Sequence, residues 1–234
     1  MFAQTCQSGF VSLLYSIGPR PLQLWEKHAG ATPGKIRRVL DDEVQSAVVE
    51  LLADNLVPTW IRCPAAAADE EEEEEQQQQQ QQQAQLSTTS LHIRLRHLVL
   101  VLKNLGQHLS LEVQTADDRG TRRRFRFSTF QSETVVHAQI ALLPLQLDEG
   151  WNQLQLDLVD LARRCYSARY AHTISVQLHA SCRVRRVYFA EHMVSEAALP
   201  AEFRLYKRLS ALQTRRLQEQ SCGRAHQEHQ TEEQ

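Results

Sequence analysis

Arginine is the residue type whose number and spacing suggest chemistry in this sequence, and it gathers in three short segments of the second half of the chain. The segments read RRRFRF from position 122, LARRCY from position 161 and CRVRRVYF from position 182. A guanidinium group is planar, stays charged and donates paired hydrogen bonds to carboxylates or phosphates. The pattern therefore predicts that the chain holds an acidic partner without catalysing a reaction. The residues predicted to contact that partner are Arg122, Arg124, Arg126, Arg163, Arg164, Arg183, Arg185 and Arg186.

The first arginine segment has the two-residue period of a β-strand. Phe125 and Phe127 point to one face, and Arg122, Arg124 and Arg126 point to the other. On one strand face such residues are about 7 Å apart, so three guanidinium groups form a basic stripe. Asp117 to Gly120 is a turn signal, and the alternating run from Leu109 to Thr115 is the predicted hairpin partner.

The third arginine segment breaks its own alternation. Its apolar residues form two pairs of opposite parity, Cys182 with Val184 and Val187 with Phe189. A β-bulge near Arg185 and Arg186 brings both pairs to the core side, and we expect it to turn both guanidinium groups outward. The second segment, with Arg163 and Arg164, is expected on a short helix between strands.

Several interpretations of the arginines remain open from the residues alone. In the simplest one they lie on a solvated sheet face, paired with acids such as Glu112, Asp157 and Glu191. In the sharper one they form a rigid docking surface for an acidic partner. A nuclear or nucleic-acid accessory role is the main alternative, but it favours aromatic rings exposed between the arginines, and the alternation places the phenylalanines on the opposite face. A sugar-binding sandwich would need an exposed aromatic row or a calcium loop.

Catalytic and metal-binding patterns are weak. The segment from Gly30 to Lys35 lacks the spacing of a phosphate-binding loop. The metal-ligand candidates are His179 with Cys182, which would face opposite sides of one strand, and the trio Cys222, His226 and His229. Nothing in the sequence orients His172 toward Cys165 as a base for a thiol nucleophile. We therefore predict no enzymatic activity, no metal site and no cofactor.

The elements that must position the arginines read mostly as strands. The candidate strands are residues 10–17, 44–52, 59–63, 92–103, 109–115, 122–127, 139–143, 152–158 and 173–180. The LVLVL run within 92–103 fits a strand buried on both faces. A short helix opens at Asp157 or Asp160 and runs through Tyr166, and Ser195 can cap another before Pro200. This pattern predicts an all-β fold, a single β-sandwich or jelly roll with one or two short helices and a C-terminal helical tail.

One stretch of the chain has the composition of a disordered insert. Alanine, glutamate and glutamine runs fill residues 65–90, and Asp69 to Glu75 are seven consecutive acids. Without these acids the net charge of −2 becomes 26 basic against 21 acidic side chains, a mildly basic balance. We predict one sandwich domain from residues 1–64 and 91–206. Residues 65–90 are a disordered loop of repeat expansion or an interaction tether, and residues 207–234 are partly helical, then disordered.

Cysteine usage and hydropathy point to a cytosolic setting. The five cysteines are an odd number without regular spacing, and no N-x-S/T sequon occurs. We expect Cys63 and Cys182 to be buried thiols. No signal peptide is recognised, and no apolar run approaches the roughly 20 residues of a membrane span.

Short blocks along the chain resemble the cilia- and flagella-associated protein 20 family. They begin with QSGF, LYSIG, PLQ-x-W and TWIRCP in the first 64 residues. They continue with KNL, RRRFR, GWNQ, RRVYF and LPAEF between Lys103 and Phe203. The blocks follow the family order and cover most of residues 1–206. The departures are the insert after Pro64, the residues His92, Arg96 and His97, and the tail after Tyr206, so the chain looks like a divergent member.

The resemblance implies a compact β-sandwich and a structural role. Members of the family are expected at the inner junction of ciliary doublet microtubules, in the axoneme and near the basal body, where the B-tubule meets the A-tubule. The implied partners are α/β-tubulin, the parkin-coregulated protein and other inner-junction proteins. Neither a membrane nor a nucleic acid is implied as a partner.

Overall fold

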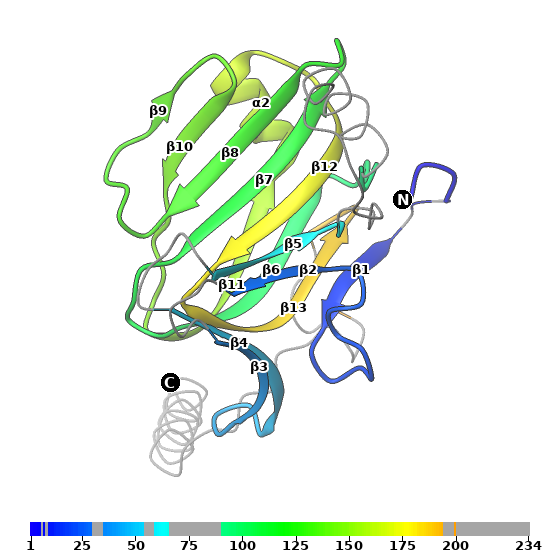
Figure 1. Ribbon diagram of the computed structural model, residues 1–234. Helices are drawn as coiled ribbons and strands as arrows, with labels where there is room; N and C mark the ends of the chain where they lie inside the picture. Colours follow the sequence, from blue (N-terminus) through cyan, green and yellow to red (C-terminus); the bar gives the residue numbers. More distant parts are fainter. Residues whose placement is uncertain are drawn as a thin grey trace, which may run out of the picture.

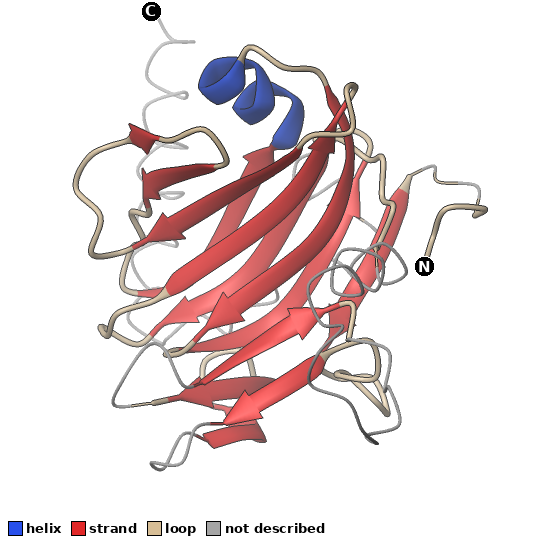
Figure 2. Cartoon of the chain, turned by 45° about the horizontal axis from the view of Figure 1, so that its top comes forward, coloured by secondary structure: helices blue, strands red, loops and turns tan. Residues whose placement is uncertain are grey.

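The computed structural model describes residues 1–5, 7, 9–29, 35–53, 59–65, 90–193 and 199. These residues form two β-sheets packed face to face, with one short helix, α2, at one end of the sandwich (Figures 1 and 2). The predicted helix at Ser195 and Pro200, the tail and the insert residues 66–89 lie outside the described residues. The sequence-based prediction of an all-β sandwich is confirmed.

The first sheet has six strands in the order β11-β6-β13-β4-β3, with β1 also paired to β13. Its strands are β1 (Phe10–Tyr15), β3 (Lys35–Asp41), β4 (Ser46–Leu52), β6 (His97–Asn104), β11 (Gly150–Asp157) and β13 (Cys182–Ala190). All the pairings in this sheet are antiparallel. The strand β13 is central, since it pairs with β6 on one side and with β4 and β1 on the other.

The second sheet has seven strands in the order β2-β5-β12-β7-β8-β10-β9. Its strands are β2 (Glu26–Ala29), β5 (Thr59–Cys63), β7 (Ser110–Asp117), β8 (Arg122–Ser128), β9 (Val135–Val136), β10 (Ile140–Pro144) and β12 (Tyr170–His179). The predicted hairpin is present as β7 and β8, with Glu112 opposite Arg126. Its turn contains Gly120 at φ +76°, and Asp117 Oδ1 accepts the backbone N–H groups of Arg119 and Thr121.

Between the sheets lies one continuous hydrophobic core. The six-stranded sheet contributes Leu98, Leu100, Leu102, Val184 and Phe189, and the seven-stranded sheet contributes Ile61, Val113, Phe125, Val176 and Leu178, all fully buried. The LVLVL run is buried on both faces as predicted. Its leucines face this core, while Val99 and Val101 join two smaller clusters on the outer face of the six-stranded sheet.

The helix α2 (Leu158–Tyr166) begins where the sequence allowed it. Asp157 is the N-cap, and its carboxylate accepts the backbone N–H groups of Val159 and Asp160 at 3.1 Å each. Arg96 donates to both oxygens of the same carboxylate, which fixes its orientation. The helix buries Leu158, Leu161 and Ala162 against the core.

Candidate partner-binding surfaces

The eight predicted arginines lie in three separate places and do not form one surface. Three are on β8 in the seven-stranded sheet, two are on α2, and three are on β13 in the six-stranded sheet. Because the two sheets face each other across the core, the outer sides of β8 and β13 look in opposite directions. The three groups must therefore be considered one at a time.

The β8 group keeps the parity that the sequence predicted. Phe125 and Phe127 are buried in the core, and the arginines alternate with them on the outer face. Two of the arginines share one acid: Arg124 Nε is 3.1 Å from Glu112 Oε1, and Arg126 Nη2 is 2.9 Å from Glu112 Oε2. Their side chains remain 45% and 41% exposed. Glu112 thus neutralises part of the positive charge of the stripe, yet the guanidinium groups of Arg124 and Arg126 still reach solvent.

The α2 group is the most exposed. Arg163 and Arg164 are 75% and 67% exposed, and both bind Asp160, at 2.7 and 2.6 Å. Their position near the helix C-terminus also suits the negative end of the helix dipole. The predicted placement of this pair on a short helix is confirmed.

The β13 group contains the main error in the predicted arginine positions. The register between β13 and β6 shifts between Val184 and Arg186, so the expected bulge is present, and the apolar pairs around it are buried. Arg185 and Arg186, however, are not turned outward: they are only 7% and 2% exposed. Because β13 is a central strand, its neighbours cover these side chains. The Arg186 guanidinium lies 3.8 Å from the centre of the Tyr15 ring, and Arg185 donates to Ser46 Oγ.

Arg183, the remaining member of this group, belongs to a charged network on the outer face of the six-stranded sheet. Its Nη1 is 2.8 Å from Asp41 Oδ2, and its Nε is 2.8 Å from Glu50 Oε2. Lys103 Nζ binds Asp41 at 3.2 Å and Glu43 at 2.7 Å. We name the set Asp41, Glu43, Glu50, Lys103 and Arg183 the Asp41 network.

Asp41 is the centre of this network and is completely buried. Its Oδ1 accepts the indole N–H of Trp151 at 3.2 Å and the backbone N–H groups of Glu43 and Val44. Burial alone raises the pKa of the Asp41 carboxyl, but the hydrogen bonds from Arg183, Trp151 and Lys103 outweigh it and hold the pKa at about 2. The carboxylate therefore stays charged and ties β3, β6, β11 and β13 together. This is a structural role, and it places Arg183 in the fold's own framework.

The cysteines and histidines form no metal centre in the part of the chain that the structure describes. Cys63 and Cys182 are buried thiols, as expected, and burial raises the pKa of the Cys63 thiol to about 12. His179 and Cys182 do not share a strand: one ends β12 and the other begins β13, in different sheets. Cys222, His226 and His229 lie outside the described residues. Among the described helices none is long and apolar enough to cross a membrane.

Sequence reasoning overlooked three strands, the two-residue β9 and the longer β2 and β3, and with the latter two it overlooked the cations that they carry. Their sequences, EKHA and KIRRVLD, lack regular alternation, and β2 is only four residues long. Together with the loop between β1 and β2 they line a groove that contains Arg20, Lys27, Arg37 and Arg38. The density of cations in residues 20–38 was the available signal, but without the strands nothing indicated that these side chains converge.

Comparison with known proteins places the chain in a family. The model of the CFA20 domain matches residues 1–207. A protein of Chlamydomonas reinhardtii named "Cilia- and flagella-associated protein 20" is 43% identical over 206 residues, which are 88% of this chain and 97% of the relative. Proteins of the same name from Paramecium tetraurelia and Caenorhabditis elegans are 43% and 41% identical over the same share of this chain, and the matches cover 96% and 91% of them.

Among solved structures, a family 11 carbohydrate-binding module of the cellulase Lic26A-Cel5E of Clostridium thermocellum aligns with a TM-score of 0.40. The sequence identity is 8%, and the alignment covers 81% of this chain and 99% of the module. A likeness of this degree carries no information on ligands. The family match and the three relatives, by contrast, span the whole sandwich, and the chain belongs to the CFA20 domain family of cilia- and flagella-associated proteins.

Proposed function

We propose that this chain is a non-enzymatic structural protein of ciliary and flagellar doublet microtubules, where it joins the B-tubule to the A-tubule at the inner junction. The observation that carries the proposal is the family match: the aligned region covers nearly the full length of relatives named for cilia and flagella. A ciliary or flagellar location follows from that membership. The position at the inner junction and within the axoneme is the finer part of the proposal.

The architecture supports a bridging role. The charged β8 stripe lies on the outside of the seven-stranded sheet, and the α2 arginines lie at one end of the sandwich. A stiff body with separated charged surfaces can contact two different partners at once. Tubulin, the parkin-coregulated protein and other inner-junction proteins are the partners we propose. Contacts repeated along a filament add avidity, so no single interface has to be strong.

The β8 stripe remains the best candidate for the tubulin-facing surface. Arg124 and Arg126 are half exposed and held on a rigid strand, so little side-chain entropy is lost when a carboxylate binds. Their partner Glu112 is itself a carboxylate, and an acid of a partner protein would make the same kind of contact. The nucleic-acid alternative gains no support here, because Phe125 and Phe127 are buried and present no ring to a base.

The test is to localise a tagged chain and to image doublet microtubules from the same cells by cryo-electron microscopy. We expect the tag along motile cilia or flagella, and density that fits the sandwich at a regular repeat of the inner junction. Loss of that density when the gene is deleted, and its return with the tagged chain, would identify it. An even distribution through the cell, or unchanged junction density without the chain, would contradict the proposal.

A further inference from the structure

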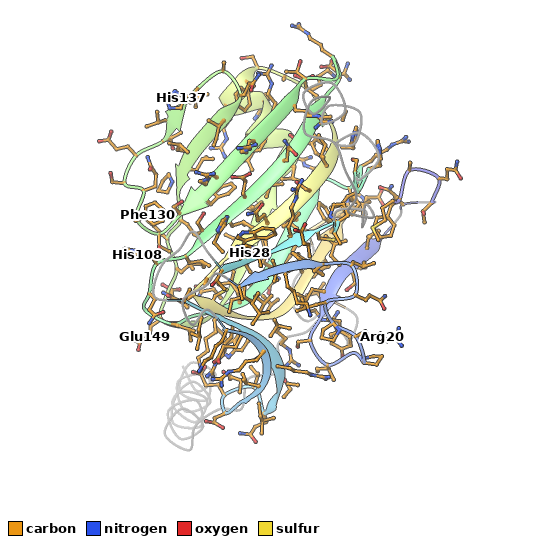
Figure 3. The ribbon with its side chains drawn as sticks, viewed as in Figure 1. Arg20, His28, His108, Phe130, His137 and Glu149 are labelled. Atoms are coloured by element: carbon orange, nitrogen blue, oxygen red, sulfur yellow. The ribbon has the colours of Figure 1, made fainter. Side chains whose placement is uncertain are left out.

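A basic groove lies at the edge of the six-stranded sheet, and none of the eight arginines that the sequence singled out lines it. Its volume is about 420 Å³, and it is bounded by the loop between β1 and β2, by β2, by β3 and by one residue of β4. Leu22, Ile36 and Val49 supply apolar lining, and Pro19 and Pro21 stiffen the loop wall. Arg20, labelled in Figure 3, projects from this loop at the side of the molecule.

The groove carries four cations and no acidic side chain among its described lining residues: Arg20, Lys27, Arg37 and Arg38. All four are exposed. Arg37 binds the buried Glu50 at 2.8 Å, and Glu50 also binds Arg183 of the Asp41 network. Arg38 donates to the neutral backbone oxygen of Ile17 at 2.9 Å. Three positive charges beyond the Arg37–Glu50 pair therefore line an apolar groove, and complementarity calls for an acidic ligand.

The position of the groove favours an extended peptide as that ligand. In the described part of the chain β3 pairs only with β4, so β3 is an edge strand, and its residues 36–38 line the groove. An edge strand offers backbone N–H and C=O groups to a further strand. The apolar lining suits the methylene groups of glutamate. No aromatic side chain lines the described groove, so a nucleic acid would find nothing for its bases to stack on.

We propose that this groove is a second docking site, which binds an extended, glutamate-rich peptide segment of a partner protein. The proposal goes beyond the inner-junction role and does not depend on it, because it concerns the purified chain and a peptide. Binding places the peptide carboxylates beside Arg20, Lys27 and Arg38. The Arg37–Glu50 pair stays in place as part of the sheet.

The chain's own acids are the competing occupant. Asp69, the first of seven consecutive acids, follows four residues after Ala65, and the Ala65 N–H bonds the Leu24 carbonyl at 3.0 Å, next to the loop wall. The experiment therefore uses two proteins, the full chain and a full-length chain in which Glu70 to Glu75 are replaced by glutamine.

The experiment measures the binding of a fluorescent hexaglutamate peptide by anisotropy, with hexaglutamine as the neutral peptide. The groove variant is Arg20→Gln, Lys27→Gln and Arg38→Gln. The matched control is Arg94→Gln, Arg119→Gln and Arg169→Gln, which removes three exposed charges outside the groove. Circular dichroism melting curves verify that both variants fold.

Two proteins have an intact groove: the full chain and the chain in which Glu70 to Glu75 are replaced by glutamine. We expect both of them to bind hexaglutamate and not hexaglutamine. The affinity should fall about tenfold or more between roughly 50 and 300 mM salt, because exposed charges are screened. The groove variant should lose about tenfold in affinity, and the control variant should stay within about twofold.

Three results would overturn the proposal. One is an equal loss of affinity in the groove and control variants. Another is equally tight, groove-dependent binding of a single-stranded oligonucleotide of matched charge. The third is peptide binding only after Glu70 to Glu75 are replaced, since the groove would then be filled by the chain itself. None of these results bears on the junction density, so the two proposals fail separately.

Discussion

At the scale of single residues, one buried carboxylate explains why the six-stranded sheet tolerates so many charges. Asp41 receives hydrogen bonds from Arg183, Lys103 and Trp151, which come from three different strands. A buried charge is costly unless it is paired and hydrogen-bonded, and here both oxygens are satisfied. Arg183 looked like a docking residue in the sequence because its acidic partner lies 142 positions away.

Replacing Asp41 with asparagine should destabilise the protein by about 3 kcal/mol, because Arg183 and Lys103 would lose their shared buried acceptor. Chemical denaturation measures this change in the free energy of unfolding. The matched control is Asp160→Asn, whose two ion pairs are exposed and worth about 1 kcal/mol or less. Equal losses in the free energy of unfolding in the two variants would contradict the structural role assigned to the Asp41 network.

The same carboxylate predicts a pH dependence. The folded pKa of Asp41, about 2, is below its ordinary value of 3.8, so the folded chain favours the ionised form. Its contribution to stability, about 2 kcal/mol, is complete above roughly pH 4 and is lost as the pH falls toward 2. Unfolding curves from pH 5 to 2 should therefore show the stability gap between the natural chain and Asp41→Asn narrowing by about 2 kcal/mol. A constant gap would contradict the assigned pKa.

At the scale of elements, the helix α2 depends on its first residue more than on its exposed arginines. Asp157 caps two backbone N–H groups and also binds Arg96. Replacing Asp157 with alanine should cost about 1–2 kcal/mol, measured by denaturation, because the cap and the ion pair are lost together. Replacing Arg163 with glutamine should cost under about 0.5 kcal/mol; a larger cost there than at Asp157 would reverse this assignment.

The arginines of the β8 strand should contribute strongly to partner binding and only weakly to the stability of the fold. Replacing Arg122, Arg124 and Arg126 with glutamine should lower the melting temperature only modestly, since the guanidinium ends of the two ion pairs to Glu112 are 45% and 41% exposed. Retention of the chain on isolated axonemes in a salt-extraction series should fall sharply. Glutamine is preferable to glutamate here, because a new acid would repel Glu112. Retention that survives high salt as in the natural chain would exclude this surface.

At the scale of the whole molecule, the acidic and glutamine-rich insert connects two points that lie close together. Cys63 is opposite Val176 on β12, and Leu91 donates its N–H to the Ile174 carbonyl of the same strand. The ends of the insert are thus fixed by the sandwich itself. A long loop between such ends costs little extra closure entropy.

Deleting residues 66–89 and joining the ends with a short glycine–serine linker should change the melting temperature by less than about 3 °C, for this reason. Differential scanning calorimetry measures the change. A drop of ten degrees or more would mean that the insert packs on the sandwich. A variant that replaces the same residues with a glycine–serine linker of equal length separates loop length from loop composition.

The sequence by itself determined the fold class, the β7–β8 hairpin, the helix start at Asp157 or Asp160, the doubly buried β6 strand and the bulge in β13. Each of these follows from local patterns: two-residue alternation, capping chemistry and turn residues act between neighbours along the chain. The family resemblance likewise rests on short local blocks, and the family match confirms it.

Only the tertiary structure decided what each arginine does. Arg185 and Arg186 are buried because strands distant in sequence flank β13, and Arg183 is committed to Asp41 and Glu50. The basic groove arises from β2 and β3, which lack a periodic signal. A guanidinium group has the same local signature whether it meets solvent, a ring or a carboxylate. Its environment depends on long-range strand order, which local spacing does not encode.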